Sequence, residues 1–164
     1  WTLDRLAAAA PGAAVARTMP NLAVRHGAGI VAMAARGLDA ERAGALRERL
    51  HALGTVVELP EAIFPAATAL AGSGPGFLAL VAEGLEEGAV GAGLSRGDAR
   101  RMVAGVLAGT AALLADGGDP AALRQRVSSP AGTTVAGLAA LERGAVRAHL
   151  ADAVAAAARR AEEL

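Results

Sequence analysis

The feature that most constrains the fold is a change of pattern at Leu59 and Pro60. Before this point helical and extended patterns alternate, whereas after it the apolar residues recur only at helical spacing. Alternation is typical of an α/β layer, and an uninterrupted helical stretch is typical of a bundle. We therefore predict an α/β part over residues 1–59 followed by an all-α part over residues 60–164.

Turn residues bound the elements predicted for the first part. We expect a short helix over residues 2–10, strands over residues 13–19, 30–35 and 55–58, and a helix over residues 40–53. Asp39 is expected to cap the second helix, and Gly54 to end it in the left-handed conformation.

The second part is predicted to be helical on both sides of the glycine-rich segment 72–76, which we interpret as a helix break. Helices are expected over residues 61–70, 75–91, 95–115 and 145–164, with two more that begin at Asp119-Pro120 and after Ser129. Ser95 and Asp98 resemble a capping box. Glycine and alanine in the helix that follows would let another helix approach closely, which favours a tight bundle or a helix-mediated dimer.

Composition excludes several classes of function. Sixteen acidic residues balance sixteen basic ones and aromatic residues make up 2%, so nucleic-acid binding is not expected. Every basic residue is arginine, which excludes lysine chemistry, and cysteine is absent, which is compatible with a cytoplasmic location. The three histidines are scattered without ligand spacing, so we expect no metal site.

The uncharged run over residues 62–82 is long enough to cross a bilayer. It contains Pro65 and Pro75 and is rich in alanine, which is only weakly apolar. We therefore predict a buried helix pair of a soluble protein here and no membrane span.

A hydroxyl-rich turn over residues 128–134 precedes an apolar helical pattern. Ser129 followed by Pro130 predicts a helix cap and a first helical residue. The amides that follow, with the hydroxyls of Ser129, Thr133 and Thr134, could hold a carboxylate or a phosphate. An ordinary capped helix is the alternative interpretation of this turn.

Three segments together resemble the pyrroline-5-carboxylate reductase family. They are Met19-Pro20-Asn21 after a strand, Gly72-Ser73-Gly74-Pro75 inside a helical run, and the turn over residues 128–134. The runs 94–96, 123–127 and 141–144 extend the resemblance to nearly the whole chain. The resemblance implies the C-terminal part of a Rossmann-type domain joined to a helical dimerisation bundle, in a cytoplasmic homodimer or higher homo-oligomer. It also implies reduction of the C=N bond of 1-pyrroline-5-carboxylate to L-proline with NADPH or NADH, the last step of proline biosynthesis.

The same resemblance implies roles for individual residues. Ser129 and the amides around Gly132, Thr133 and Thr134 would bind the substrate carboxylate, and the Thr134 hydroxyl would meet the ring nitrogen as the catalytic group. Met19, Pro20 and Asn21 would lie near the nicotinamide at the carboxyl end of a strand. A Pro-Asn turn without a ligand is the alternative interpretation of this segment.

The sequence also departs from the family pattern. Ala131 stands where the family usually has a second glycine, and Leu22-Ala23 and Gly76-Phe77 replace Thr-Pro and Ala-Tyr. If position 131 requires a positive φ, alanine there costs roughly 1 kcal/mol. No G-x-G-x-x-G follows a strand, so we expect the phosphate-binding half of the cofactor domain to precede Trp1 and the chain alone to bind NADPH poorly.

Other functions stay open at this point. One is a non-catalytic helical dimerisation module, and another is a paralogous reductase that acts on a different cyclic imino acid. A dehydrogenase of the hydroxyacid type is disfavoured because that class uses a lysine near the reacting carbon, and this chain has none.

Overall fold

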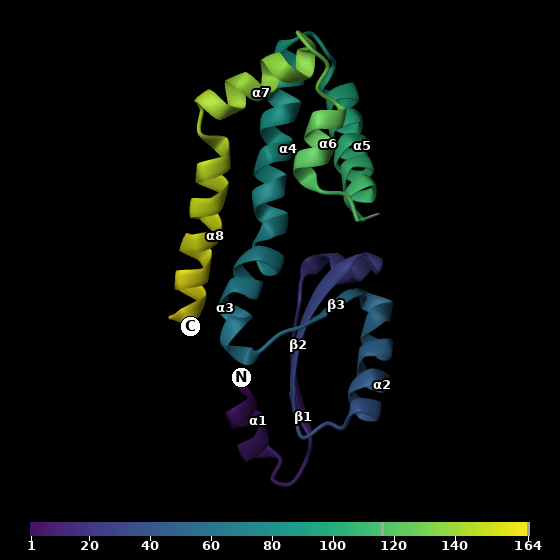
Figure 1. The fold of residues 1–164 in the computed structure, drawn as a ribbon, viewed down its shortest axis with the longest axis vertical. Helices are drawn as coiled ribbons and strands as arrows, with labels where there is room; N and C mark the ends of the chain where they lie inside the picture. The colour runs from purple at the N-terminus through teal and green to yellow at the C-terminus, as the bar shows by residue number, and fades with distance from the viewer. Residues whose placement is uncertain (116, 164) are drawn as a thin grey trace. The chain divides into compact units, whose positions relative to one another are not determined.

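The computed structural model describes residues 1–115 and 117–163. These form two compact units (Figure 1): an N-terminal unit, Trp1–Pro75 with Asp152–Leu164, and a helical unit, Gly76–Ala151. The predicted order, α/β followed by all-α, is confirmed. Leu164, expected to be the last residue of the final helix, lies outside the described residues.

The N-terminal unit contains a sheet whose described strands have the order β1-β2-β3. β1 (Val15–Pro20) pairs antiparallel with β2 (Gly29–Arg36), and β2 pairs parallel with β3 (Gly54–Glu58). Helix α1 (Leu3–Ala9) contacts β1 and β2, and α2 (Ala40–Leu50) contacts β3, so the helices flank the sheet (Figure 1). All three predicted strands are present with small shifts at their ends.

The core of this unit lies on β2. Val31, Ala32, Met33 and Ala34 are all buried, as is typical of a strand that is covered on both faces. Phe64, which is 1% exposed, packs with Ala32 and Ala34, so the helical run that follows the sheet is anchored in the sheet's own core.

The conformation expected at Gly54 is wrong. Asp39 caps α2 as predicted, with Oδ1 accepting from the Arg42 amide at 2.8 Å, but the helix ends at Leu50 and a 3-10 turn, η2 (His51–Leu53), follows. Gly54 has φ +134° and ψ −145°, outside the left-handed helical region. A Cβ at this position would lie 2.0 Å from the Gly29 carbonyl oxygen, so glycine is required by the close approach of β2 and β3.

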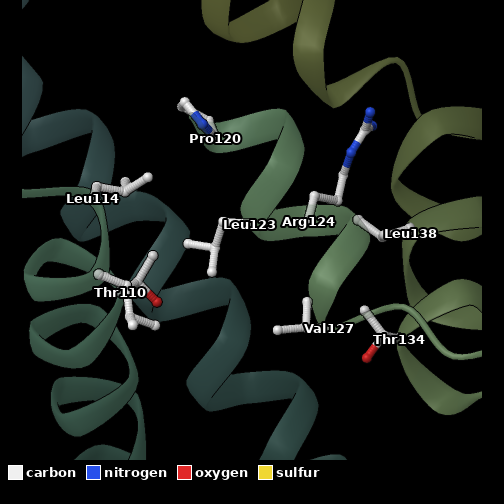
Figure 2. Close-up of a pocket in the computed structure, with 9 residues that line it drawn as sticks. Thr110, Leu114, Pro120, Leu123, Arg124, Val127, Thr134 and Leu138 are labelled. Atoms are coloured by element: carbon white, nitrogen blue, oxygen red, sulfur yellow. The ribbon is translucent and has the colours of Figure 1, made fainter. Parts of the chain in front are cut away.

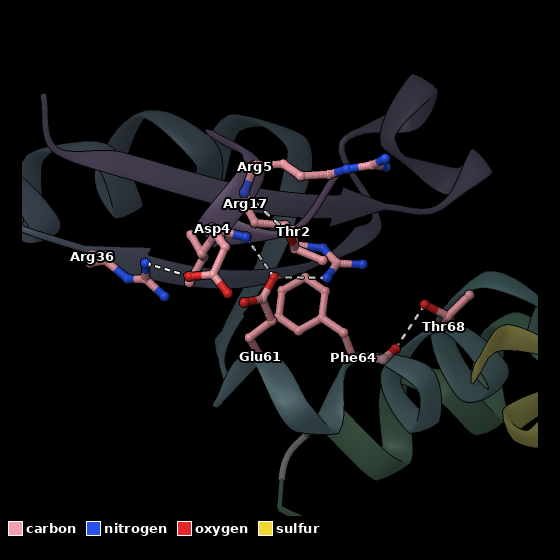
Figure 3. A network of polar contacts seen from close by, with 9 residues as sticks. Thr2, Asp4, Arg5, Arg17, Arg36, Glu61, Phe64 and Thr68 are labelled. Atoms are coloured by element: carbon pink, nitrogen blue, oxygen red, sulfur yellow. Dashed lines mark hydrogen bonds and ion pairs between the residues drawn. The ribbon is translucent and has the colours of Figure 1, made fainter. Parts of the chain in front are cut away.

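A charged contact joins α1, β1 and the helical run (Figure 3). Glu61 Oε1 accepts from the Leu3 amide at 2.8 Å and from Arg17 Nη1 at 2.9 Å. The Arg17 guanidinium also lies 4.6 Å from the centre of the Phe64 ring, within the range of a cation–π contact. The backbone hydrogen bond from Leu3, and then that from Arg17, lower the pKa of the Glu61 carboxyl.

The helix break predicted at residues 72–76 is confirmed only as a local interruption, because a π-turn ends at Gly72, Ser73 is a turn residue and the next α-helix begins at Gly74. η3 (Glu61–Ile63), α3 (Phe64–Ala67), the π-turn η4 (Thr68–Gly72) and α4 (Gly74–Gly91) follow one another (Figure 1). The Ser73 amide donates to the Thr68 carbonyl, five residues back, at 3.2 Å. Within the described part of the chain, residues 61–91 are the one helical run long and apolar enough, by length and composition, to cross a membrane.

The helical unit continues with α5 (Arg96–Ala115), α6 (Pro120–Arg126), α7 (Thr133–Arg143) and the start of α8 (Val146–Glu162). Ser95 caps α5 as predicted, because its hydroxyl accepts from the Asp98 amide at 3.1 Å. Asp98 deviates from the capping-box geometry, since its carboxylate accepts from the Ser95 hydroxyl at 2.6 Å. Hydrogen bonds from Ser95 and then Arg101 lower the pKa of Asp98.

Large apolar side chains of the helical unit stay on its surface. Ala99 is the one buried residue among the described residues of 76–151. Leu78 and Leu80 of α4 are 57% and 69% exposed, and Met102 and Val106 of α5 are 58% and 57% exposed. The helices of this unit therefore leave most of their apolar surface uncovered.

Glu86 couples α4 to α5 and is expected to make the protein acid-sensitive. Its carboxylate accepts from Arg100 at 3.4 Å and from Arg96 at 3.1 Å, and these bonds lower its pKa below the ordinary 4.5. The Glu86 carboxylate therefore binds a proton less tightly in the folded state than in the unfolded chain. The stability that its ion pairs contribute is lost as the pH falls below about 4.5. Between about pH 6 and pH 3 the melting temperature should fall less in Glu86→Gln than in the wild type.

Glu87 provides the control for this experiment. It is the neighbouring exposed carboxylate, and no ion pair among the described residues includes it. Glu87→Gln should follow the wild-type pH profile, and an equal response of the two variants would contradict a specific role of Glu86.

Candidate functional site

The hydroxyl-rich turn is positioned by the way α6 ends. Asp119 caps the start of α6, with Oδ1 accepting from the Ala121 amide at 3.1 Å, as the Asp119-Pro120 pair predicted. At the other end the Ser128 amide donates to the Gln125 carbonyl at 3.0 Å, and the Ser128 hydroxyl donates to the Arg124 carbonyl at 2.7 Å. Ser128 therefore closes α6 and delivers the chain into the turn.

The turn itself spans Ser129 to Gly132. The Gly132 amide donates to the Ser129 carbonyl at 3.0 Å, with Pro130 in the second position and Ala131 at φ +56° in the third. Proline followed by a positive φ is the pattern of a type II turn. Position 131 thus adopts the conformation for which glycine is the usual residue.

The predicted start of the helix after this turn is wrong by three residues. Ser129 is not the cap and Pro130 is not helical, because α7 begins at Thr133 with Gly132 as its N-cap. Pro130 serves the turn instead, where its fixed φ suits the second position. The shift explains how the Ser129 hydroxyl stays available, since it caps no helix.

The amino end of α7 keeps donors that no side chain caps. The amides of Thr133 and Thr134 point out of the first turn, whereas the Gly132 amide is already used by the turn. Ser129 and Thr133 are exposed and Thr134 is half-buried. This arrangement of amides, hydroxyls and a helix dipole suits an anion.

Gly132 brings the Ser129 hydroxyl against the start of α7. A Cβ at position 132 would lie 2.4 Å from Ser129 Oγ, so any side chain there would displace the hydroxyl. The residues predicted to bind the carboxylate, Ser129, Gly132, Thr133 and Thr134, thus lie at the junction of the turn and α7, with the Gly132 amide no longer free.

Thr134 also lines an apolar cavity of about 330 Å³ within the helical unit (Figure 2). The side chains around it come from α5, α6 and α7 and include Leu113, Leu114, Leu123, Val127 and Leu138. Thr134 therefore stands where the uncapped helix end meets an apolar surface. Such a border suits a small ligand that has one charged end and an apolar ring.

An ion pair holds the two helices that flank the turn. Arg124 Nη1 of α6 lies 3.4 Å from Glu142 Oε1 of α7, and Arg147 of α8 contacts the same oxygen. Arg124 and Glu142 belong to the two runs, 123–127 and 141–144, that extended the family resemblance. These runs thus contribute an ion pair between the two helices that flank the turn.

The other predicted site segment, Met19-Pro20-Asn21, lies in the N-terminal unit at the end of β1. Met19 packs against the core and Pro20 is exposed. Asn21 Oδ1 accepts from the amides of Ala23 and Ile30, both at 3.2 Å. The side chain of Asn21 therefore serves the local fold.

The hydrogen bond from Asn21 Nδ2 to the Ala71 carbonyl, at 3.0 Å, was not foreseen from the sequence. The available signal was Pro75, because a proline in a helical run leaves the carbonyl four residues earlier without its helical donor. That carbonyl belongs to Ala71, and Asn21 donates to it.

The comparisons with known proteins decide the family. The family model described as pyrroline-5-carboxylate reductase dimerisation matches residues 61–164. The chain belongs to this family. The resemblance that rested on the three segments is thereby confirmed.

Relatives and solved structures of the pyrroline-5-carboxylate reductase family match the sheet as well. The pyrroline-5-carboxylate reductase of Synechocystis sp. is 39% identical over 99% of this chain and 62% of its own length. The solved pyrroline-5-carboxylate reductase of Coxiella burnetii is 30% identical, with a TM-score of 0.90 over 94% of this chain and 58% of that one. The Plasmodium falciparum pyrroline carboxylate reductase with NADP bound shares the fold, with a TM-score of 0.86 at 24% identity over 98% of this chain and 66% of that one. This chain thus spans about three fifths of the length of the relatives it matches.

The backbone at Ala131 yields a prediction on stability. Glycine adopts a φ of +56° without the strain that alanine bears, and this gain exceeds glycine's larger loss of chain entropy. Ala131→Gly should therefore stabilise the protein by about 0.5–1 kcal/mol and raise its melting temperature by about 1–4 °C. Ala139→Gly, inside α7, is the matched control and should lower the melting temperature. A decrease in both variants would contradict strain at position 131.

Proposed function

We propose that this chain carries the substrate-binding and dimerisation part of an enzyme that reduces 1-pyrroline-5-carboxylate to L-proline with NAD(P)H. The observation that carries the proposal is the uncapped amino end of α7, with Ser129 and Thr134 beside it, in a member of this reductase family. We also propose a cytoplasmic location and a domain boundary between residues 59 and 60, one residue before the family match begins.

The substrate carboxylate would bind at the start of α7. The amides of Thr133 and Thr134 and the Ser129 hydroxyl are the donors for it, and the helix dipole favours its negative charge. The apolar ring of the substrate would then lie toward the side chains around Thr134. Binding in this way fixes the orientation of the imine relative to the Thr134 hydroxyl.

Thr134 is the proposed catalytic residue. When bound, NAD(P)H supplies the hydride that adds to the imine carbon. As the C=N bond is reduced, the ring nitrogen becomes more basic and takes up a proton. The Thr134 hydroxyl is the group of this chain that would donate a hydrogen bond to that nitrogen and stabilise the developing charge.

The residues near the end of β1 fit the nicotinamide end of such a cofactor only in part. Pro20 is exposed and offers an apolar surface, whereas Met19 is packed against the core and the side chain of Asn21 is already hydrogen-bonded. The sequence holds no G-x-G-x-x-G after a strand to cradle the phosphates. We propose that Pro20 and the backbone beside it contact the nicotinamide.

A homo-oligomer is the proposed partner state. On α5 the exposed side chains Met102, Val106 and Leu113 fall on one stripe, whereas on α4 Leu78 and Leu80 lie on different sides of the helix. A helix that is apolar on more than one side is stable in water only between other helices. A second copy of this chain supplies matching helices, as the dimerisation family implies.

The catalytic assignment predicts distinct kinetic effects for two hydroxyls. A chimera in which this chain replaces the matching segment of the Synechocystis relative supplies the remaining length for the assay. Ser129→Ala should raise the KM for 1-pyrroline-5-carboxylate about tenfold, because one charge-assisted hydrogen bond is lost. Thr134→Ala should lower kcat about 10- to 100-fold, because its hydrogen bond matters most as the nitrogen gains basicity.

Ser95→Ala is the control, because the Ser95 hydroxyl caps α5 and belongs neither to the turn nor to the cavity that Thr134 lines. It should leave KM and kcat unchanged. A folded chimera that oxidises NADPH with another cyclic imine only would indicate a paralogous reductase, and one that oxidises it with none would indicate a dimerisation module without catalysis. Unchanged kinetics in both Ser129→Ala and Thr134→Ala would remove this turn from the site.

The oligomer proposal predicts the effect of one charge on α5. Val106→Asp places a carboxylate on the exposed stripe and should shift the 164-residue chain from oligomer to monomer in light scattering. Ala111→Asp is the control, since Ala111 is exposed on a different side of the same helix. A monomeric wild type, or equal dissociation by both variants, would contradict the proposed interface.

A further inference from the structure

We infer that Asn21 is a positioning residue that ties the end of β1 to the helical run after the sheet. This inference rests on the proposed function in one respect, because it assigns how the segment Met19-Pro20-Asn21 is held for a cofactor. The tie itself is independent of that function. It is a hydrogen bond from Asn21 Nδ2 to the Ala71 carbonyl at 3.0 Å.

The amide group of Asn21 has complementary partners on both sides. Its oxygen accepts from the amides of Ala23 and Ile30, and its nitrogen faces a carbonyl. An asparagine oxygen has two acceptor positions, and both are filled here. An ionised aspartate would keep an acceptor at this position but has no donor for the Ala71 carbonyl, so the geometry requires a side chain that both donates and accepts, as the asparagine amide does.

Pro75 explains why the Ala71 carbonyl needs an outside donor. In a helix the amide of residue 75 would donate to the carbonyl of residue 71, and proline has no N–H. The π-turn over Thr68–Gly72 already departs from the α-helical hydrogen-bond pattern before Pro75. Asn21 then donates to the carbonyl for which Pro75 has no N–H. A part-buried carbonyl without a donor is costly, so the two residues should be energetically coupled.

The tie also fixes the segment where the cofactor is proposed to bind. Asn21 donates its own amide to the Ile30 carbonyl at 3.2 Å, which holds it to β2, and its side chain holds it to the helical run. Met19 Sδ lies 3.9 Å from the position that a Cβ of Gly72 would occupy, so the same two segments also approach each other closely at Gly72. Pro20, between these residues, is therefore held in place from both sides.

The test is a double-mutant cycle in thermal unfolding of the 164-residue chain. Asn21→Ala should lower the melting temperature by about 4–8 °C, because the Ala71 carbonyl and two amides lose their partner. In the Pro75→Ala background the loss should be smaller by about half, because the alanine introduced there has an N–H that can donate to the Ala71 carbonyl. Equal losses in both backgrounds would overturn the coupling.

Pro65→Ala is the matched control for this cycle. Pro65 lies in the first turn of α3, where its missing N–H leaves no interior carbonyl without a donor. The loss caused by Asn21→Ala should be the same with and without Pro65→Ala. If Pro65→Ala reduced the loss caused by Asn21→Ala as much as Pro75→Ala does, any proline change in this helical run would produce the effect. That result would overturn the specific tie between Asn21 and the Ala71 carbonyl.

Kinetics of the chimera separate positioning from mere stabilisation. If Asn21 positions the cofactor segment, Asn21→Ala should raise the KM for NADPH, and the double variant with Pro75→Ala should keep that KM raised although about half of the lost stability is regained. Recovery of KM together with stability would reduce Asn21 to a stabilising residue and overturn the positioning role. A chimera without any turnover contradicts the proposed function, whereas the melting cycle still decides the tie.

Discussion

The constraint on which the structure depends is that the described residues of 76–151 fully bury almost none of their own apolar side chains. Ala99 is the one buried residue in the described part of this unit, although α4 and α5 present leucine, valine and methionine to the surface. Burying such side chains stabilises a protein by roughly 25 cal/mol for each Å² of apolar surface, so a lone copy forgoes much of its available stability. The turn over residues 129–132 lies in the same unit, between α6 and α7.

The candidate site is built from backbone more than from side chains. Ser128 ends α6, Gly132 ends the turn, and α7 presents amides that no side chain caps. Because these donors belong to the backbone, substitution leaves them in place as long as the turn keeps its shape. Ala131 shows that the turn keeps this shape even with alanine at a positive φ.

Sequence patterns predicted the elements well and their junctions poorly. The alternation before Leu59, the cap at Asp39 and the cap at Ser95 are local signals, and the structure confirms them. Gly54 and Pro130 were misassigned because a glycine or a proline has more than one use: Gly54 permits two strands to approach, and Pro130 shapes a turn. The bond from Asn21 to Ala71 joins residues 50 positions apart: Pro75 indicates that the Ala71 carbonyl lacks its helical donor, but no local pattern identifies Asn21 as the donor that replaces it.

Every ion pair of the described residues draws its cation from arginine, and the sequence contains no lysine. The guanidinium group of arginine is protonated over the pH range in which proteins stay folded, so alkaline solution should not break these ion pairs. Its side chains also offer no primary amine. Cross-linkers, fluorophores and immobilisation surfaces that react with lysine will therefore leave the side chains of this protein unmarked, and its assembly has to be trapped through carboxylates or by photochemistry.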